Sequence, residues 1–158
     1  MKVFNCLILS LAMLGFFSHA SAAPALSYGP NVQLQQAKQV AKAAVLEAER
    51  LNLRVAVAIV DTAGHLVYFE KADDTQTASV EVAIAKARSA SNFRRPTKVF
   101  EDALAGGRTS ILGLPGAVPV EGGLPIVLNN RIIGAIGISG ASSAEDGVIA
   151  AAAVSAIQ

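Results

Sequence analysis

The stretch DTAGHLVYFEK, residues 61–71, holds the strongest candidate for chemistry in this chain. The chain has two histidines, and His65 is the one that lies beyond the first 22 residues. A histidine can serve as a general base, as a metal ligand or as an axial ligand of haem iron. Asp61 and Gly64 are typical of a type I turn in which the glycine takes a positive φ. His65 therefore either carries a ligand or simply begins the strand after this turn.

Other metal ligands are scarce. The single cysteine, Cys6, and both methionines, Met1 and Met13, fall within the first 22 residues. A closed zinc site needs about four Cys, His or carboxylate ligands. Haem needs only an apolar slot and one axial ligand, for which this chain offers a histidine and two tyrosines beyond residue 22: His65, Tyr28 and Tyr68.

Basic side chains supply further candidates. Arg94, Arg95 and Lys98 cluster between two predicted helices, where they are either solvated or pair with a ligand carboxylate. Lys86 and Arg88 are expected on the polar face of a helix, facing solvent or an acidic neighbour. The composition alone does not separate these alternatives.

Two glycine-rich stretches resemble enzyme motifs without matching them. GISGA approaches the GxSxG nucleophile elbow, but Ala141 replaces its last glycine and no histidine follows Ser139, as that class of hydrolase requires. GAIGISG has the spacing GxxGxxG instead of the dinucleotide-binding GxGxxG. The sequence therefore argues against a GxSxG serine hydrolase, and a nucleotide-binding fold is rejected.

Hydrophobic periodicity predicts the elements that position these residues. Residues 31–51 form an amphipathic helix capped by Asn31, and residues 55–60 form a strand that is apolar on both faces. Residues 65–71 return as the second strand of a hairpin. The helices that follow are expected at residues 77–90 and 97–104.

The C-terminal half begins with a loop, residues 106–123, rich in glycine and proline, with one short strand at residues 117–120. A second hairpin, residues 124–128 and 131–139, is joined by Asn129 and Asn130, which tolerate a type I′ turn. Ser143 and Asp146 resemble a capping box that starts the last helix. In that helix, residues 150–153 are all alanine, so one stripe can pack on the sheet while Ala152 meets a partner subunit.

The layers follow from these patterns. Two hairpins make an antiparallel sheet, and a strand apolar on both faces needs helices on both faces. The predicted fold is α+β, with three α/β/α layers. In residues 131–139 one face carries Ile133, Ala135, Gly137 and Ser139; it is nearly bare and suits the close approach of a helix, a subunit or a flat ligand.

The N-terminus has the pattern of a secretory signal peptide. Lys2 precedes an apolar run at residues 3–17, and small residues up to Ala22 suit cleavage after that position. We expect a signal peptide at residues 1–22, a linker at 23–30 and a single domain at 31–158. Loss of Lys2 leaves 12 basic and 12 acidic residues, so nothing favours binding to nucleic acid or to an anionic membrane. The expected location is periplasmic or secreted, with no membrane span after cleavage.

Three segments together resemble the GlcG/HbpS-like family of haem-binding proteins. They are VAVAIVDTAGHLVYFEK, SVEVAIAKARSA and EGGLPIVLNNRIIGAIGISGASSAEDGVIAAAA, in that order. The resemblance implies a profilin-like α/β/α fold around a five-stranded antiparallel sheet. It also implies haem binding and association into dimers and octamers.

The resemblance also transfers roles to individual residues. His65 matches a histidine implicated as a haem ligand, and Asp61 and Gly64 match the turn that precedes it. The other matching residues are Lys86, Gly122, Gly123, Pro125, Gly137, Ser139 and Gly140. These surround either one pocket or one subunit interface.

The leading hypothesis is a secreted or periplasmic oligomer that binds haem, or a related small molecule, without catalysis. His65 would be the axial ligand, and Arg94, Arg95 or Lys98 would pair with propionates. One alternative is an enzyme acting on a small organic acid or aldehyde, with His65 as general base beside Asp61 and Lys86 as charge stabiliser. A second alternative is a non-catalytic assembly or accessory protein of a catabolic pathway.

Overall fold

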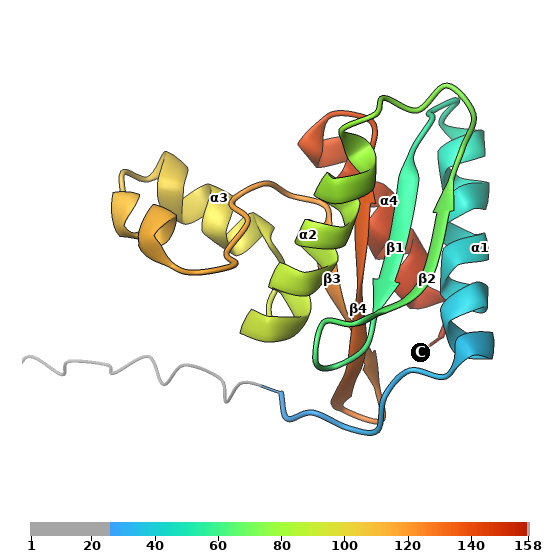
Figure 1. The fold of residues 1–158 in the computed structure, drawn as a ribbon, viewed down its shortest axis with the longest axis horizontal. Helices are drawn as coiled ribbons and strands as arrows, with labels where there is room; N and C mark the ends of the chain where they lie inside the picture. Colours follow the sequence, from blue (N-terminus) through green and yellow to red (C-terminus); the bar gives the residue numbers. More distant parts are fainter. Residues whose placement is uncertain (1–25, 158) are drawn as a thin grey trace, which may run out of the picture.

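The structure is a computed structural model that describes residues 26–157. In chain order its elements are α1 (Leu34–Arg50), β1 (Ala56–Val60), β2 (Leu66–Lys71), α2 (Ser79–Phe93), α3 (Lys98–Ala105), the 3-10 helix η1 (Thr109–Gly113), β3 (Gly123–Leu128), β4 (Arg131–Ser139) and α4 (Ser143–Ser155) (Figure 1). The predicted signal peptide lies outside the described residues. Within residues 26–157, no helix is long and apolar enough to cross a bilayer.

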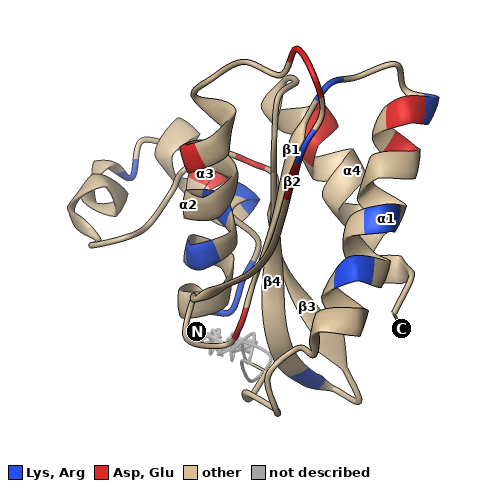
Figure 2. Ribbon diagram, turned by 45° about the vertical axis from the view of Figure 1, so that its right-hand side comes forward, with Lys and Arg blue, Asp and Glu red and all other residues tan. Residues whose placement is uncertain are grey.

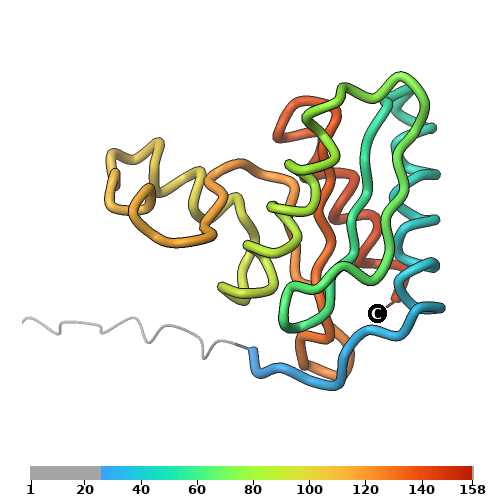
Figure 3. The backbone as a smooth tube through the Cα atoms, viewed as in Figure 1, coloured from blue at the N-terminus to red at the C-terminus, as the bar shows by residue number. Residues whose placement is uncertain are grey.

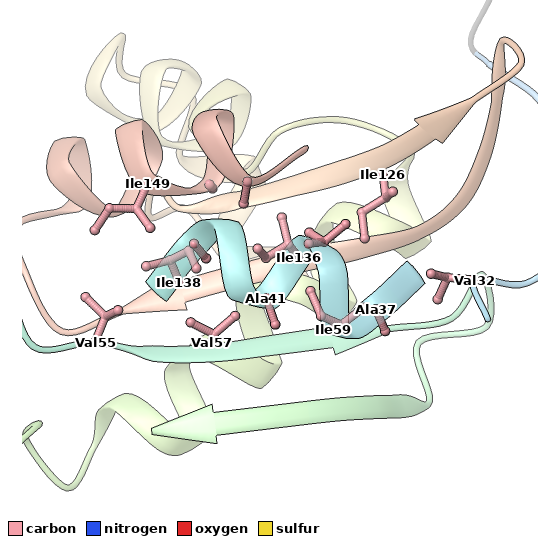
Figure 4. Packing of buried hydrophobic residues seen from close by; sticks show 14 of the residues in the cluster. Val32, Ala37, Ala41, Val55, Val57, Ile59, Ile126, Ile136, Ile138 and Ile149 are labelled. Atoms are coloured by element: carbon pink, nitrogen blue, oxygen red, sulfur yellow. The ribbon is translucent and has the colours of Figure 1, made fainter. Parts of the chain in front are cut away.

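The strands form one antiparallel sheet in the order β2-β1-β4-β3, as the two predicted hairpins require. Every residue of β1 is buried, because helices cover both faces of the sheet. Val57 and Ile59 pack with residues of α1, β4 and α4, as Figure 4 shows. Ala56, Ala58 and Val60 pack instead with alanines of α2. The α+β class and the antiparallel sheet are thus confirmed.

The bare face of β4 is covered by α2. A Cβ atom added to Gly137 would lie 2.0 Å from the carbonyl oxygen of Ala83, so the helix backbone approaches the strand directly. Ile133 was expected on this face, but it packs in the opposite cluster with Ile136 and Ile138. The reason is a bulge: in the β3–β4 register Gly134 pairs with Ile126 and Ile132 with Val127, which leaves Ile133 unpaired.

The two hairpin turns match their predictions. Gly64 has a φ of 81°, and its N–H donates to the carbonyl oxygen of Asp61 at 3.1 Å. Asn129 and Asn130 have φ values of 50° and 58°, as a type I′ turn demands. Both turns are encoded by their own residues.

The sheet has four strands among the described residues, where the family resemblance implied five. Near the start of β4, Tyr28 forms one isolated parallel bridge with Ile132. Its two hydrogen bonds run from the Gly29 N–H to the Ile132 carbonyl at 2.8 Å and from the Ile132 N–H to the Ser27 carbonyl at 2.9 Å. The short strand expected at residues 117–120 is also absent, and η1 is the regular element of that loop.

The first and last helices are capped by other residues than predicted. α1 starts after Gln33, whose N–H donates to the Oε1 atom of Gln36 at 2.9 Å. Asn31, the predicted cap, instead accepts a hydrogen bond from the Thr62 hydroxyl. At α4 the capping box consists of Ser142 and Glu145, one residue earlier than predicted, which frees Asp146 for another contact.

Residues 98–121, which we call the arm, project from the sheet between α2 and β3 (Figure 3). Thr97 fixes the base of the arm: its N–H donates to the Gly123 carbonyl and its hydroxyl accepts from the Gly123 N–H, both at 3.0 Å. Farther along, the Val118 N–H donates to the Ser89 hydroxyl of α2 at 3.0 Å. The Ser143 hydroxyl of α4 also donates to the Glu101 carboxylate at 3.2 Å, so the arm is tied to the body at three places.

Candidate functional site

His65 stands at the end of a turn organised by Asp61. The Oδ1 atom of Asp61 accepts the N–H groups of Ala63 and His65, each at 2.9 Å. Its Oδ2 atom lies 3.3 Å from the Nδ1 atom of the His65 ring, and the His65 side chain is 80% exposed. Burial alone would raise the pKa of the Asp61 carboxyl, but these hydrogen bonds outweigh it and lower that pKa. The result is a carboxylate that holds an exposed imidazole by one nitrogen.

The turn is anchored on the C-terminal half of α2. The Arg88 Nε atom donates to the Gly64 carbonyl at 3.1 Å, and the Ser91 hydroxyl donates to the Asp61 carbonyl at 2.9 Å. The Tyr28 hydroxyl in turn donates to the Ser91 carbonyl at 2.8 Å. His65 therefore projects from a fixed backbone, although its own ring is in solvent.

Lys86 is placed differently from its prediction. It was expected on the polar face of α2, but only 1% of it is exposed, and its ammonium donates to Asp146 Oδ2 at 2.8 Å and to the Ile138 carbonyl at 3.1 Å. Because α2 lies so close to Gly137, more of its circumference is buried than its apolar positions suggested.

The sequence carried a signal for this burial. Ser79, Ala83, Lys86 and Ala90 are spaced by three and four and share one helix face. Asp146 was missed as the partner because it was assigned to helix capping. Burial raises the pKa of the Asp146 carboxyl, while the Lys86 ammonium opposes that rise.

The glycine loop closes around this ion pair. Gly122 has a φ of 121°, and an added Cβ would lie 2.9 Å from the Lys86 Nζ atom. At Gly123 an added Cβ would lie 2.4 Å from the Lys86 carbonyl oxygen. Lys86, Gly122, Gly123 and Asp146 are thus brought together, as a packed cluster.

His65 and Lys86 lie toward opposite ends of β1. The turn follows Val60, which pairs with Leu66, whereas Lys86 contacts Ile138, which pairs with Val57. Three residues of strand separate these pairs by about 10 Å. Asp61 and His65 could act together as a base, but the structure does not bring Lys86 to them.

The predicted basic cluster is divided. Arg94 ends α2 in the left-handed conformation, and its guanidinium lies 5.6 Å from the centre of the Tyr28 ring. Arg95 lies over the Phe100 ring at 5.8 Å, and Lys98 binds Asp102 at 2.8 Å on the arm. Through Tyr28 and Ser91, Arg94 shares the end of α2 that holds the His65 turn.

No group of three or more His, Cys, Asp or Glu side chains suited to a metal ion occurs within residues 26–157. A small cavity of about 70 Å³ lies between the end of α1 and the end of β2. An open hollow of about 290 Å³ adjoins the tip of the second hairpin, at residues 127–130. His65 lines neither of them.

Comparison with known proteins gives one consistent result. A family model described as haem degrading protein HbpS-like matches residues 32–155. Protein GlcG of Escherichia coli K12 is 36% identical over 105 residues, which cover 66% of this chain and 78% of GlcG.

Two solved structures are also similar. The crystal structure of the PduOC:heme complex has a TM-score of 0.73 and 29% identity, and the match covers 81% of this chain and 96% of that one. A double mutant of HbpS from Streptomyces reticuli has a TM-score of 0.75 and 28% identity, covering 89% of this chain and 96% of its own.

Proposed function

Because the chain belongs to the HbpS-like family of haem degrading proteins, we propose that it binds haem, or a related tetrapyrrole, as a secreted or periplasmic oligomer. The observation that carries the proposal is the exposed His65 ring, held by Asp61 at the end of a fixed turn. The similarity to a protein crystallised with haem supports it.

The donor chemistry of this turn fits haem iron. With Asp61 Oδ2 on the Nδ1 side of the ring, the Nε2 atom of His65 is left for a metal, and a carboxylate behind a histidine ligand raises its basicity. The hydroxyls of the two tyrosine candidates are already engaged, Tyr28 with Ser91 and Tyr68 with Glu70. His65 is therefore the axial ligand we assign.

Arginines near the same end of α2 suit the haem propionates. The Arg94 and Arg95 guanidinium groups lie over the Tyr28 and Phe100 rings. Each also donates one N–H to a backbone carbonyl, of Leu26 and Phe93 respectively, and keeps further N–H groups for a carboxylate. Lys98, which is paired with Asp102, is the weaker candidate. In this proposal Lys86, Gly122 and Gly123 support the fold and do not touch the ligand.

A second copy of the chain would complete the site. An imidazole that is 80% exposed covers little of a porphyrin, and haem binding needs apolar contact on both faces of the ring. The neighbouring Tyr28 and Leu66 are 40% and 45% exposed and offer such a surface to a partner. We therefore place haem at a contact between subunits, in an assembly between a dimer and an octamer.

The proposed location rests on the N-terminal sequence. Export through a cleaved segment at residues 1–22 would deliver the protein to the periplasm or beyond the cell. The mass of the mature N-terminal peptide, measured after expression of the whole gene, should correspond to cleavage after Ala22. Recovery of an intact N-terminus from the purified protein would contradict this location.

The test of haem binding is a haemin titration followed at the Soret band. The mature protein should take up haemin to saturation, and His65→Ala should weaken uptake at least tenfold. Ala63→Ser is the matched control, because it alters an exposed position of the same turn and leaves the imidazole in place, and it should bind as the natural protein does. Equal uptake by His65→Ala would remove His65 as the ligand.

The same titration separates the alternatives. An absence of saturable uptake would favour the enzyme, for which the Asp61–His65 pair is the supporting observation, or the accessory protein. An enzyme on small organic acids should bind carboxylates, so a rise in Tm with such acids would favour it. If neither haemin nor small acids change the Tm, the accessory role stands.

A further inference from the structure

The cavity between α1 and β2 is a second candidate site, separate from His65. Its lining residues are Val45, Ala48, Glu49, Leu53, Arg54, Val55, Glu70 and Ala72. β2 begins directly after His65 and ends at Lys71, so Glu70 and Ala72 lie at the opposite end of the strand from the histidine. Nothing in the haem proposal uses these residues.

The interior of the cavity is apolar and small. Five of its lining residues are Val45, Ala48, Leu53, Val55 and Ala72. Its volume of about 70 Å³ exceeds the roughly 10–15 Å³ that a single water molecule needs. It is well below the roughly 150 Å³ of a cavity that holds benzene, so a branched aliphatic group of a few carbon atoms is the size that fits.

Charges of both signs surround this apolar space. Glu49 and Glu70 contribute carboxylates, and Arg54 contributes a guanidinium. Within the described residues, neither Glu49 nor Arg54 takes part in a salt bridge, whereas nearby Arg50 is paired with Glu47 at 2.7 Å. Figure 2 shows both acidic and basic positions near the end of α1 and near the end of β2.

We propose that this cavity binds an α-amino acid with a small aliphatic side chain. The side chain would enter the apolar interior, the carboxylate would meet the Arg54 guanidinium, and the ammonium would meet Glu49 and Glu70. A simple amine would leave Arg54 without a partner. A simple acid would leave Glu49 without one and Glu70 with the Tyr68 hydroxyl alone. A zwitterion satisfies both signs at once.

Isothermal titration calorimetry of the mature protein tests this proposal with L-valine. Isobutylamine and isovalerate are the matched probes, since the first lacks the carboxylate and the second lacks the ammonium. L-Valine should bind saturably, and each probe should bind at least tenfold more weakly. The proposal is overturned if L-valine gives no saturable heat at millimolar concentration, or if all three compounds bind alike.

Variants locate the binding. Arg54→Gln should weaken L-valine at least tenfold, and Ala72→Leu, which fills the cavity, should abolish binding. Arg50→Gln is the control, because Arg50 lies nearby but does not line the cavity, and it should leave binding unchanged. Unaltered affinity in Arg54→Gln would overturn the assignment. Arg54→Gln should also keep full haemin uptake, which makes this result independent of the haem proposal.

Discussion

The Lys86 ammonium and the Asp146 carboxylate are removed from water together, with exposed fractions of 1% and 2%. Replacing the lysine would leave the carboxylate buried without its partner. We expect Lys86→Met to lower the free energy of unfolding by about 3–5 kcal/mol in urea denaturation. The double variant Lys86→Met/Asp146→Leu should recover part of this loss, because it removes both charges.

A surface pair provides the control for this prediction. Lys98 binds Asp102 at the same 2.8 Å, but 51% of the Lys98 side chain is exposed. Lys98→Met should change the free energy of unfolding by no more than about 1 kcal/mol, since water screens this pair. If Lys86→Met lowered the free energy of unfolding by no more than Lys98→Met does, the buried pair would not stabilise the fold as we expect.

Asp61 gives a prediction about pH. Burial works against it, but hydrogen bonds lower its pKa in the folded protein, so the unfolded chain binds the proton more tightly. Its contribution to stability is present above the unfolded Asp pKa of about 3.9 and is lost as the pH falls through the lower folded value. Asp61→Asn keeps an acceptor oxygen for the turn but has no such proton equilibrium.

Urea midpoints measured at about pH 6 and about pH 3 test this sign. The natural protein should lose more stability over this interval than Asp61→Asn loses. If the two proteins lose the same amount, the hydrogen bonds of the turn do not depend on the charge of Asp61.

For single residues, the sequence predicts structure well where a residue contacts its immediate neighbours in the chain. Asp61 and Gly64 form their turn through contacts within four residues, and that turn was predicted. Lys86 depends on Asp146, 60 positions away, and on a strand that lets the helix come close. Composition assigns lysine to the surface, so its burial required the packing to be known.

At the scale of elements, the contact between α2 and β4 is set by Gly137. Because Gly137 has no side chain, the Ala83 carbonyl can occupy the space where a Cβ atom would lie. Neither backbone can move away easily. We expect Gly137→Ala to lower the free energy of unfolding by about 3 kcal/mol or more through overpacking, as measured by urea denaturation.

Gly113 is the matched control because an added Cβ there would meet nothing within 4 Å. Gly113→Ala should leave the free energy of unfolding within about 0.5 kcal/mol of the natural value. If Gly137→Ala proved equally neutral, α2 would have to sit farther from the sheet than it does here.

The order of helices and strands was predictable because each element carries its own period, and hairpins of adjacent strands fix an antiparallel sheet. The bulge at Ile133 was not predictable, since it arises from the register of β4 against β3. The same holds for the N-terminal segment, where Tyr28 makes a single parallel bridge to Ile132. Register is a property of two paired strands. The periodicity within one strand does not determine it.

At the scale of the whole molecule, α4 presents a stripe of small residues outward. Ala150 and Ala153 are fully buried against the core, whereas Val148 is 52% exposed, Ala151 is exposed and Ala152 is half-buried. Val148, Ala151 and Ala152 lie three and four positions apart, on one face of the helix. A partner helix could approach such a face closely.

We therefore expect this face of α4 to lie in the oligomer interface. Ala152→Glu places a charge where close packing needs a small side chain, so it should lower the molar mass measured by light scattering toward that of a monomer. Lys42→Gln changes the net charge by the same amount at an exposed position of α1 and should leave the mass unchanged. An unchanged mass in Ala152→Glu would place the interface on another face. If haem lies between subunits, as we propose, the variant that separates them should also lose haemin uptake while His65 is intact.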